Sequence, residues 1–156
     1  MCSLKDKIEL LWRFYQEHCA WERHQEAQRS SATNLVLVVA AAILSIMTIN
    51  KSIDMTDLPL TIFLIVIGVF GAVLSMKHYE RFARHQTLAG AYRAALDQEV
   101  PEAQILGIRS KAERCHTNNY RLVHKWRLHW LWIGLHAAVA LTGVFLTVGI
   151  LIGWFK

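Results

Sequence analysis

Three long apolar runs constrain the fold of this chain more than any other feature. They cover residues 30–50, 58–76 and 128–155, and only His129 and His136 interrupt the third. A helix rises about 1.5 Å per residue, so roughly 20 apolar residues cross the hydrocarbon layer of a bilayer. The alternative is a soluble bundle of hydrophobic helices, which these lengths disfavour. The sequence therefore predicts an all-α membrane protein with three transmembrane helices extended by a cytoplasmic helical bundle.

The polar segments complete the predicted organisation. We expect an N-terminal amphipathic helix over 1–29, spans over 30–50, 58–76 and 128–155, an outer loop over 51–57, and a basic cytoplasmic helical hairpin over 77–127. Charges stand in the N-terminal segment where a signal peptide would have its apolar region, so we expect the first span to be retained. The chain is 54% hydrophobic, which excludes a disordered protein.

Lysine and arginine predict the orientation of the spans. Ten of the 17 basic residues lie in 77–127 and five in 1–29, whereas the loop 51–57 and the C-terminal tail have one each. Basic residues collect on the cytoplasmic side of a membrane. The prediction is a multi-pass plasma-membrane protein whose N-terminus is cytoplasmic and whose C-terminus is outside. The formal charge of +5 is then mainly a topology signal.

Helical spacing continues beyond the second span. His78, Phe82, His85, Ala89, Tyr92 and Leu96 share one helix face, which predicts a single helix over 58–98. The segment 98–101 breaks it, and Pro101 with Glu102 is expected to begin another helix. The face of that helix is predicted to lead directly into the third span through Ile105, Ile108, Ala112, Cys115, Asn119, Leu122 and Trp126.

The N-terminal segment has a third apolar face, formed by Leu4, Ile8, Leu11, Tyr15 and Cys19. Ser3 is the predicted cap at its start, and Ser30-Ser31 are the predicted caps near the membrane. Three such faces must be buried, so we expect them to pack as a bundle, within one chain or between subunits. The alternative is that the N-terminal helix lies on the lipid surface through Trp12, Phe14 and Tyr15.

Catalytic and metal-binding patterns are missing from the sequence. The eight histidines include no His-x-x-x-His pair, and His78 and His85 are two turns apart on one face. The three cysteines have no metal spacing and are expected to be reduced. The sequence has no Walker loop and no nucleophile elbow. We therefore expect no metal, no cofactor and no enzymatic activity.

The basic segment 77–127 has two interpretations. One is a topology signal combined with affinity for anionic lipids. The other is a pocket for a small anion such as a nucleotide, in which cations contact phosphates and rings contact bases. No direct binding of DNA or RNA is expected. The candidate ligand-binding residues are Arg81, Arg84, His85, Tyr92, Arg93, Arg114, His116, Tyr120 and Arg121.

Three residues of the third span are candidates for a pore or for helix packing. His136 is ionisable at membrane depth, and such groups usually face a bundle interior or a water path. It is either a pore-lining or gating residue or a neutral imidazole bonded to another helix. Gly149 and Gly153 form a GxxxG pattern, which lets helices approach closely. This pattern supports packing, within the chain or in a homo-oligomer.

The layout also resembles a known family. A cytoplasmic helix containing residues 21–25 (WERHQ) precedes two close spans, and residues 79–85 (YERFARH) and 89–96 follow them. This order resembles the SLATT family of small bacterial membrane effectors, which are encoded beside nucleotide second-messenger synthetases and sensors. The resemblance covers residues 8–96, and the third span departs from the family's two-span pattern. It places Arg81, Arg84, His85 and Tyr92 on matching positions.

The resemblance implies antiviral defence at the bacterial inner membrane. The function expected from it is an oligomeric effector that forms or gates a pore, or disrupts the membrane, in response to a cytoplasmic signal. Its expected partners are the lipid bilayer, copies of itself, and a nucleotide second messenger or a cytoplasmic sensor protein. The alternative is a non-conducting membrane adaptor or assembly subunit that docks a cytoplasmic partner.

Overall fold

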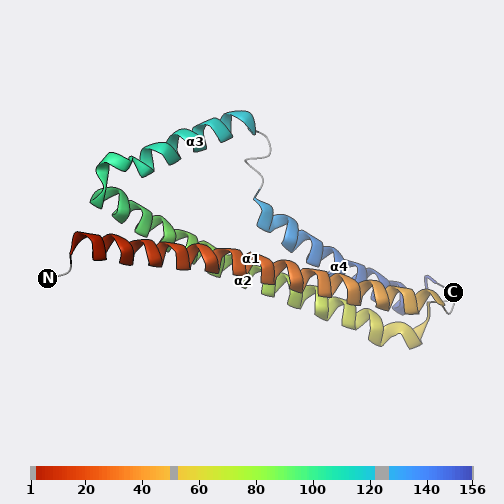
Figure 1. Cartoon of the computed structure of the whole chain (residues 1–156). Helices are drawn as coiled ribbons and strands as arrows, with labels where there is room; N and C mark the ends of the chain where they lie inside the picture. The colour runs from red at the N-terminus through yellow and green to blue at the C-terminus, as the bar shows by residue number, and fades with distance from the viewer. Residues whose placement is uncertain (1–2, 50–52, 122–126, 156) are drawn as a thin grey trace. The chain divides into compact units, whose positions relative to one another are not determined.

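The computed structural model describes residues 3–49, 53–121 and 127–155, and in these ranges it is all-helical (Figure 1). Its elements in chain order are α1 (Leu4–Ile49), the 3-10 turn η1 (Met55–Asp57), α2 (Leu58–Glu99), the 3-10 turn η2 (Pro101–Ala103), α3 (Ile105–Asn119) and α4 (Leu128–Leu151). This confirms the predicted all-α class.

Three helical segments are long and apolar enough to cross a membrane. They are Leu4–Ile49, Met55–Glu99 and Leu128–Leu151, and only 28% of the most apolar window of each is buried within the chain. Large side chains such as Ile49, Val38 and Leu141 are 65% to 74% exposed. Apolar surface on that scale is unfavourable in water. The chain therefore has the surface of a helical membrane protein, and the prediction of three spans is confirmed.

Helix α1 extends without interruption from Leu4 to Ile49. Its start was predicted correctly, because the Asp6 amide donates to Ser3 Oγ at 3.2 Å and the Ser3 amide donates to Asp6 Oδ2 at 3.1 Å. The caps predicted at Ser30-Ser31 are wrong, since both serines lie inside the helix. No glycine or proline occurs before Pro59, so nothing in the backbone forces a break there.

Helix α2 is the single long helix that the sequence predicted. The Asp54 side chain and the Asp57 side chain form a capping box at η1, and α2 follows directly at Leu58. It ends at Glu99, one residue beyond the expected bound. The new α-helix expected at Pro101 is wrong: Pro101 begins η2, and Gln104 then adopts a left-handed conformation with φ 48°. Helix α3 starts only after that residue.

Two compact units make up the chain. The polar unit contains residues 1–26 and 79–127, and the apolar unit contains residues 27–78 and 128–156. Within the polar unit, α1 and α2 contribute buried or half-buried faces, but no residue along the described length of α3 is buried. Helix α3 forms a hydrogen bond with α2, in which the Leu106 amide donates to Asp97 Oδ1 at 3.1 Å. The α3 face is therefore not buried within the chain, and its packing between subunits, the other alternative, stays a prediction.

The composition of the α3 face explains this exposure. After Ile105 and Ile108 it continues with Ala112, Cys115 and Asn119, which have little apolar area to bury. Helix α3 ends at Asn119, and Tyr120 and Arg121 form a turn, so the helix does not continue into the third span as expected. The last two predicted face residues, Leu122 and Trp126, lie outside the described residues.

The apolar unit packs parts of α1, α2 and α4 around a small core. Its buried apolar residues are Ala40, Ile43, Met47 and Leu64. Glycines bring α2 and α4 into backbone contact. A Cβ atom on Gly68 would lie 2.5 Å from the Ala140 amide nitrogen, and one on Gly143 would lie 2.8 Å from the Thr61 carbonyl oxygen. Helices that associate in lipid use small residues in this way.

The C-terminal end of α4 differs from the prediction. The third span was expected over 128–155, but α4 ends at Leu151, and residues 152–155 form turns. Gly153 has φ 70°, in the left-handed region that glycine tolerates. Gly149 faces the ring of Phe155 from the same chain. Gly149 thus lies within α4 and Gly153 lies in the turn after it, so the two glycines do not share one helix face, and their role in packing between subunits stays a prediction.

Substituting Gly68 tests the close contact between α2 and α4. In Gly68→Ala the new methyl group meets the backbone of Ala140, so the helices must separate, and we expect a loss of about 1–3 kcal/mol of unfolding free energy. The matched control is Gly134→Ala, because a Cβ there meets nothing within 4 Å. It should be neutral or stabilising by up to about 1 kcal/mol. Denaturation by SDS in mixed micelles, followed by circular dichroism, measures both; equal effects would contradict the packing.

Candidate functional site

The polar unit is organised by an antiparallel pairing of the first part of α1 with the last part of α2 (Figure 1). Lys7 Nζ lies 2.6 Å from Glu99 Oε1 at one end of the pairing. Further along, Arg93 Nη2 donates to Tyr15 Oη at 3.3 Å. His18 faces His85 beyond that. These contacts set the register in which side chains from the two helices meet.

Stacked rings fill the middle of this pairing. The rings of Phe14 and Tyr92 are 5.4 Å apart with an interplanar angle of 16°, and those of His18 and Tyr92 are 5.4 Å apart at 19°. Trp21 stacks on His85 at 5.8 Å and 13°. We call these five residues, Phe14, His18, Trp21, His85 and Tyr92, the ring cluster. It provides flat apolar surfaces beside groups that can donate and accept hydrogen bonds.

The two histidines of the ring cluster are in direct contact. His18 Nδ1 and His85 Nδ1 lie 3.0 Å apart, which is hydrogen-bond distance for ring nitrogens. Burial lowers the pKa of His85 most, and the positive charges that His18 and Arg84 can bear lower it further. Glu22 and Glu17 act in the opposite direction. The resulting pKa of His85 lies below its ordinary value, which favours the neutral ring.

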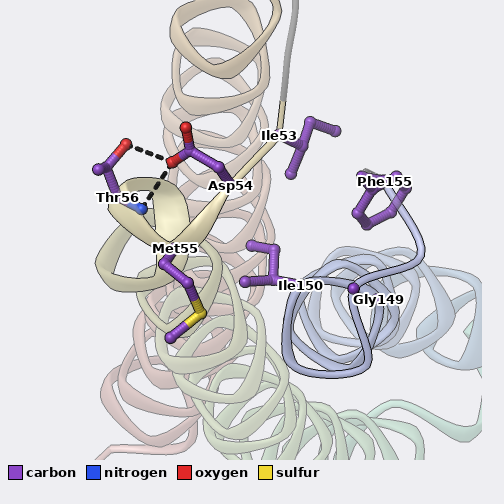
Figure 2. A pocket seen from close by; sticks show the side chains of 8 residues that line it. Ile53, Asp54, Met55, Thr56, Gly149, Ile150 and Phe155 are labelled. Carbon is purple, nitrogen blue, oxygen red and sulfur yellow. Dashed lines mark hydrogen bonds between the residues drawn. The ribbon is translucent and has the colours of Figure 1, made fainter.

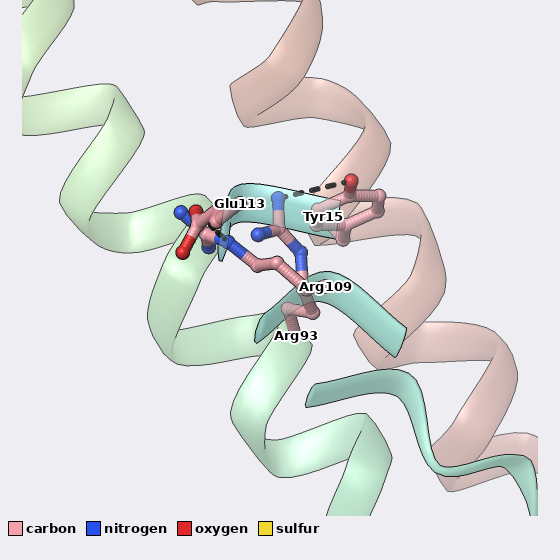
Figure 3. Close-up of polar contacts among 4 residues, drawn as sticks. All are labelled: Tyr15, Arg93, Arg109 and Glu113. Carbon is pink, nitrogen blue, oxygen red and sulfur yellow. Dashed lines mark hydrogen bonds and ion pairs between the residues drawn. The ribbon is translucent and has the colours of Figure 1, made fainter. Parts of the chain in front are cut away.

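Arg93 borders the ring cluster and contacts an aromatic ring. Its guanidinium carbon lies 5.3 Å from the centre of the Tyr15 ring, in cation–π geometry, and Figure 3 shows the hydrogen bond to the Tyr15 hydroxyl. Arg109 on α3, drawn in the same view, instead pairs with Glu113 at 2.7 Å. No described carboxylate forms an ion pair with Arg93. The charge of Arg93 is therefore available to an anion, whereas the charge of Arg109 is already paired with Glu113.

The nine predicted ligand-binding residues do not converge on one site. The structure brings three of them, His85, Tyr92 and Arg93, into contact with α1 residues in the polar unit. Arg81 and Arg84 are exposed on the same helix. The remaining four are exposed on α3 or in the turn after it: Arg114, His116, Tyr120 and Arg121. His116 and Tyr120 contact each other, with ring centres 4.9 Å apart.

Sequence reasoning missed the α1 side of the ring cluster. Phe14, His18 and Trp21 recur at steps of four and three, which is the spacing of one helix face. That face lies next to the predicted apolar face that contains Tyr15. Of its three residues, Phe14 was named in the alternative in which the N-terminal helix lies on the lipid surface. The signal that could have identified it was the matching pattern of His85 and Tyr92 at a spacing of seven on α2.

The apolar unit holds a second polar cluster, centred on His136. The residue is 2% exposed, and its Nε2 lies 3.1 Å from Thr33 Oγ1 on α1. Because the Thr33 hydroxyl donates to the Arg29 carbonyl oxygen at 2.9 Å, its oxygen accepts from His136, which places the proton on Nε2. His136 Nδ1 faces Gly71 on α2 and has no hydrogen-bond partner among the described residues.

This geometry matches one of the two interpretations of His136. A neutral imidazole bonded to another helix fits the Thr33 contact, whereas a pore-lining residue would face water. Nearby, the Arg29 guanidinium lies 5.5 Å from the centre of the Trp132 ring, and Arg29 is 3% exposed. The cluster therefore joins α1 and α4 through polar contacts inside an apolar unit.

The residues predicted as a GxxxG pair line a small cavity. It has a volume of about 210 Å³, and Gly149 and Gly153 share its wall with Ile53, Met55, Ile150 and Phe155 (Figure 2). Asp54 and Thr56 complete the lining, and two hydrogen bonds from Thr56 lower the pKa of Asp54. The other described residues of its wall are apolar or glycine.

The described residues hold no group of three or more side chains arranged to bind a metal ion. Cys19 is half-buried and Cys115 is exposed, and both are free thiols. Comparisons of the chain with protein-family models, with curated proteins and with solved structures find no match.

Removing the Thr33 hydroxyl tests the contact with His136. Thr33→Val keeps the shape of the side chain but leaves His136 Nε2 without its acceptor, so we expect a loss of about 1 kcal/mol in unfolding free energy. Thr142→Val is the matched control, because the Thr142 hydroxyl is exposed and bonds only to Ala138 of its own helix. It should change stability by less than about 0.5 kcal/mol. Equal losses in SDS denaturation would contradict a specific role for Thr33.

Proposed function

We propose that this chain is a homo-oligomeric membrane effector. Its polar unit receives a small anionic signal, such as a nucleotide, and its spans form or gate a pore or disrupt the bilayer. The observation that carries the proposal is the combination of two features in α1 and α2. Each of these helices contains a membrane-length apolar segment, and each also contributes side chains to the ring cluster. The bacterial and antiviral setting comes from the resemblance to the SLATT family.

The limited burial of the spans supports oligomerisation. With 28% of each apolar window buried, most of the span surface is left for lipid or for other subunits. Some of that surface is small or polar: Ala41, Ser45, Gly134 and Ala138 are exposed. Small residues permit close contact between helices, which lipid-facing positions do not need.

The basic residues of α2 support an anionic ligand. Arg81, Arg84 and Arg93 form no ion pair with a described carboxylate, and Arg93 lies beside flat aromatic rings. Guanidinium groups bind phosphate oxygens with paired hydrogen bonds, and aromatic rings stack on bases. Ligand binding at α2 would use both kinds of group.

The alternative function is a non-conducting adaptor that docks a cytoplasmic partner. One observation favours it, namely that no residue of α3 is buried and that Ile108 is 66% exposed. A 15-residue helix with no buried residue offers a surface to another protein. The adaptor would use α3, whereas the effector would use α2.

Accessibility of single cysteines tests the proposed orientation. Met55→Cys at η1 should react with a membrane-impermeant maleimide in intact spheroplasts, because the proposal places this turn outside. Ser110→Cys on α3 is the control and should react only after permeabilisation. Cys2, Cys19 and Cys115 are replaced by serine in both variants. The opposite labelling pattern would reverse the orientation.

Ion flux from liposomes separates the effector from the adaptor. Purified chain should release ions when candidate cyclic or linear nucleotides are added, and Arg81→Ala with Arg84→Ala should reduce that response by roughly tenfold or more, by removing two phosphate-binding groups. Arg109→Ala with Lys111→Ala removes the same charge from α3 and should leave the response intact. Absence of flux with every nucleotide would exclude the effector and favour the adaptor.

A further inference from the structure

The contact between His18 and His85 has a chemical property that the proposed function does not use. Each ring comes from a different helix, the ring centres are 5.2 Å apart, and the two Nδ1 atoms are 3.0 Å apart. It joins α1 and α2 through two imidazole side chains, each of which has one nitrogen that can accept a proton.

This geometry is compatible with only some of the protonation states of the two histidines. A neutral imidazole has one donor and one acceptor nitrogen, whereas an imidazolium has two donors. A hydrogen bond between the two Nδ1 atoms therefore needs at least one ring to be neutral. If both rings are protonated, two N–H groups and two positive charges face each other, and the contact is lost.

Stacking limits the freedom of the rings to avoid this conflict. Tyr92 stacks on His18 and Trp21 stacks on His85, at interplanar angles of 19° and 13°. A 180° flip about the Cβ–Cγ bond would keep either ring in its stacking plane, but it would replace Nδ1 by a carbon, so the hydrogen bond between the two helices would still be lost. Double protonation therefore acts on the pairing of the helices as well as on the side chains.

The charged neighbours determine how readily the second proton binds. From α1, Glu17 and Glu22 favour protonation, and from α2, Arg84 opposes it. Other titratable groups nearby include His24, which contacts Trp21 edge-on, Tyr92 in the stack, and Arg93, which borders the ring cluster. Burial of His85 outweighs the two carboxylates, so the pKa of His85 is lowered.

We propose that the His18–His85 contact is a proton-sensitive clasp between α1 and α2. The clasp is closed while at most one of the two rings is a positively charged imidazolium, and it opens when both rings are. The proposal goes beyond the proposed function and does not depend on it, because it involves no ligand and no ion flux. It assigns the polar unit a response to acidification of the solution around it.

The direction of the pH effect follows from linkage. In the open state the His85 ring has its ordinary pKa of about 6.5, and in the closed state burial and then the neighbouring His18 lower that pKa, so the open state binds more protons than the closed state. The stabilisation that pairing provides is complete above about pH 6.5 and is lost as the pH falls below it. Opening is therefore expected in mildly acidic conditions.

Distances between spin labels test the clasp in the full chain. Gln16→Cys on α1 and Gln86→Cys on α2 are exposed and border the pair, and the native cysteines are replaced by serine. In detergent at pH 8, pulsed electron–electron resonance should give one distance population. At pH 5, a longer population should include roughly half or more of the molecules. An unchanged distribution between pH 8 and pH 5 overturns the proposal.

Two variants separate the clasp from general acid sensitivity. His85→Gln and His18→Gln each leave one titrating ring opposite an amide that can donate and accept, so the contact persists and the pH response should disappear. His116→Gln on α3 is the matched control and should respond like the native chain. Native-like opening in both pair variants would assign the response to other groups and overturn the proposal.

Discussion

The close backbone contact between α2 and α4 is the interaction on which the apolar unit depends. Two helices in hydrocarbon gain little by hiding apolar side chains from lipid, so association requires dispersion contacts and hydrogen bonds at short range. Gly68 against Ala140 and Gly143 against Thr61 supply that short range. The contact also brings Thr147 Oγ1 within 2.8 Å of Thr61 Oγ1, so one antiparallel register satisfies both packing and polar groups.

The same register makes room for His136. Its position on α4 lies one helical turn from Ala140, and its ring fits only because Gly71 has no side chain. The ring then reaches α1, where Thr33 Oγ1 accepts a hydrogen bond from His136 Nε2. A buried polar group without a partner costs far more in hydrocarbon than at a surface, so such a bond favours one arrangement of the three helices over its neighbours. Polar residues thus specify the packing that the glycines permit.

Features fixed by local sequence were predictable, and features fixed by pairing were not. The three spans and the extent of α2 follow from apolar length and helical spacing, and Ser3 capped α1 as expected. Gly149 and Gly153 form the GxxxG pattern in the sequence. The close contacts between the α2 and α4 backbones are instead made by Gly68 and Gly143. No spacing rule selects these, because their role depends on which residue of the other helix lies opposite.

The candidate site divides in the same way. His85 and Tyr92 were identified because they share a predicted helix face, and Arg93 because it is a basic residue of the same segment. Their partners Phe14, His18 and Trp21 were not, since the match depends on a register set by contacts such as Lys7 with Glu99, 92 residues away in sequence. Local patterns cannot encode that offset. The sequence thus identified the α2 residues of the ring cluster, and only the structure identified its α1 residues.

The interactions that each arginine already makes limit where an anion could bind. Arg109 would have to give up an ion pair of 2.7 Å with Glu113 before it could contact a phosphate. Arg93 would give up only a 3.3 Å hydrogen bond and a cation–π contact with a neutral ring, and both are weaker than a charged pair. A phosphate that replaces Tyr15 as the partner of Arg93 would also free a tyrosine at the edge of the ring cluster. Binding at α2 would therefore alter the pairing of α1 with α2, whereas binding at α3 would leave that pairing untouched.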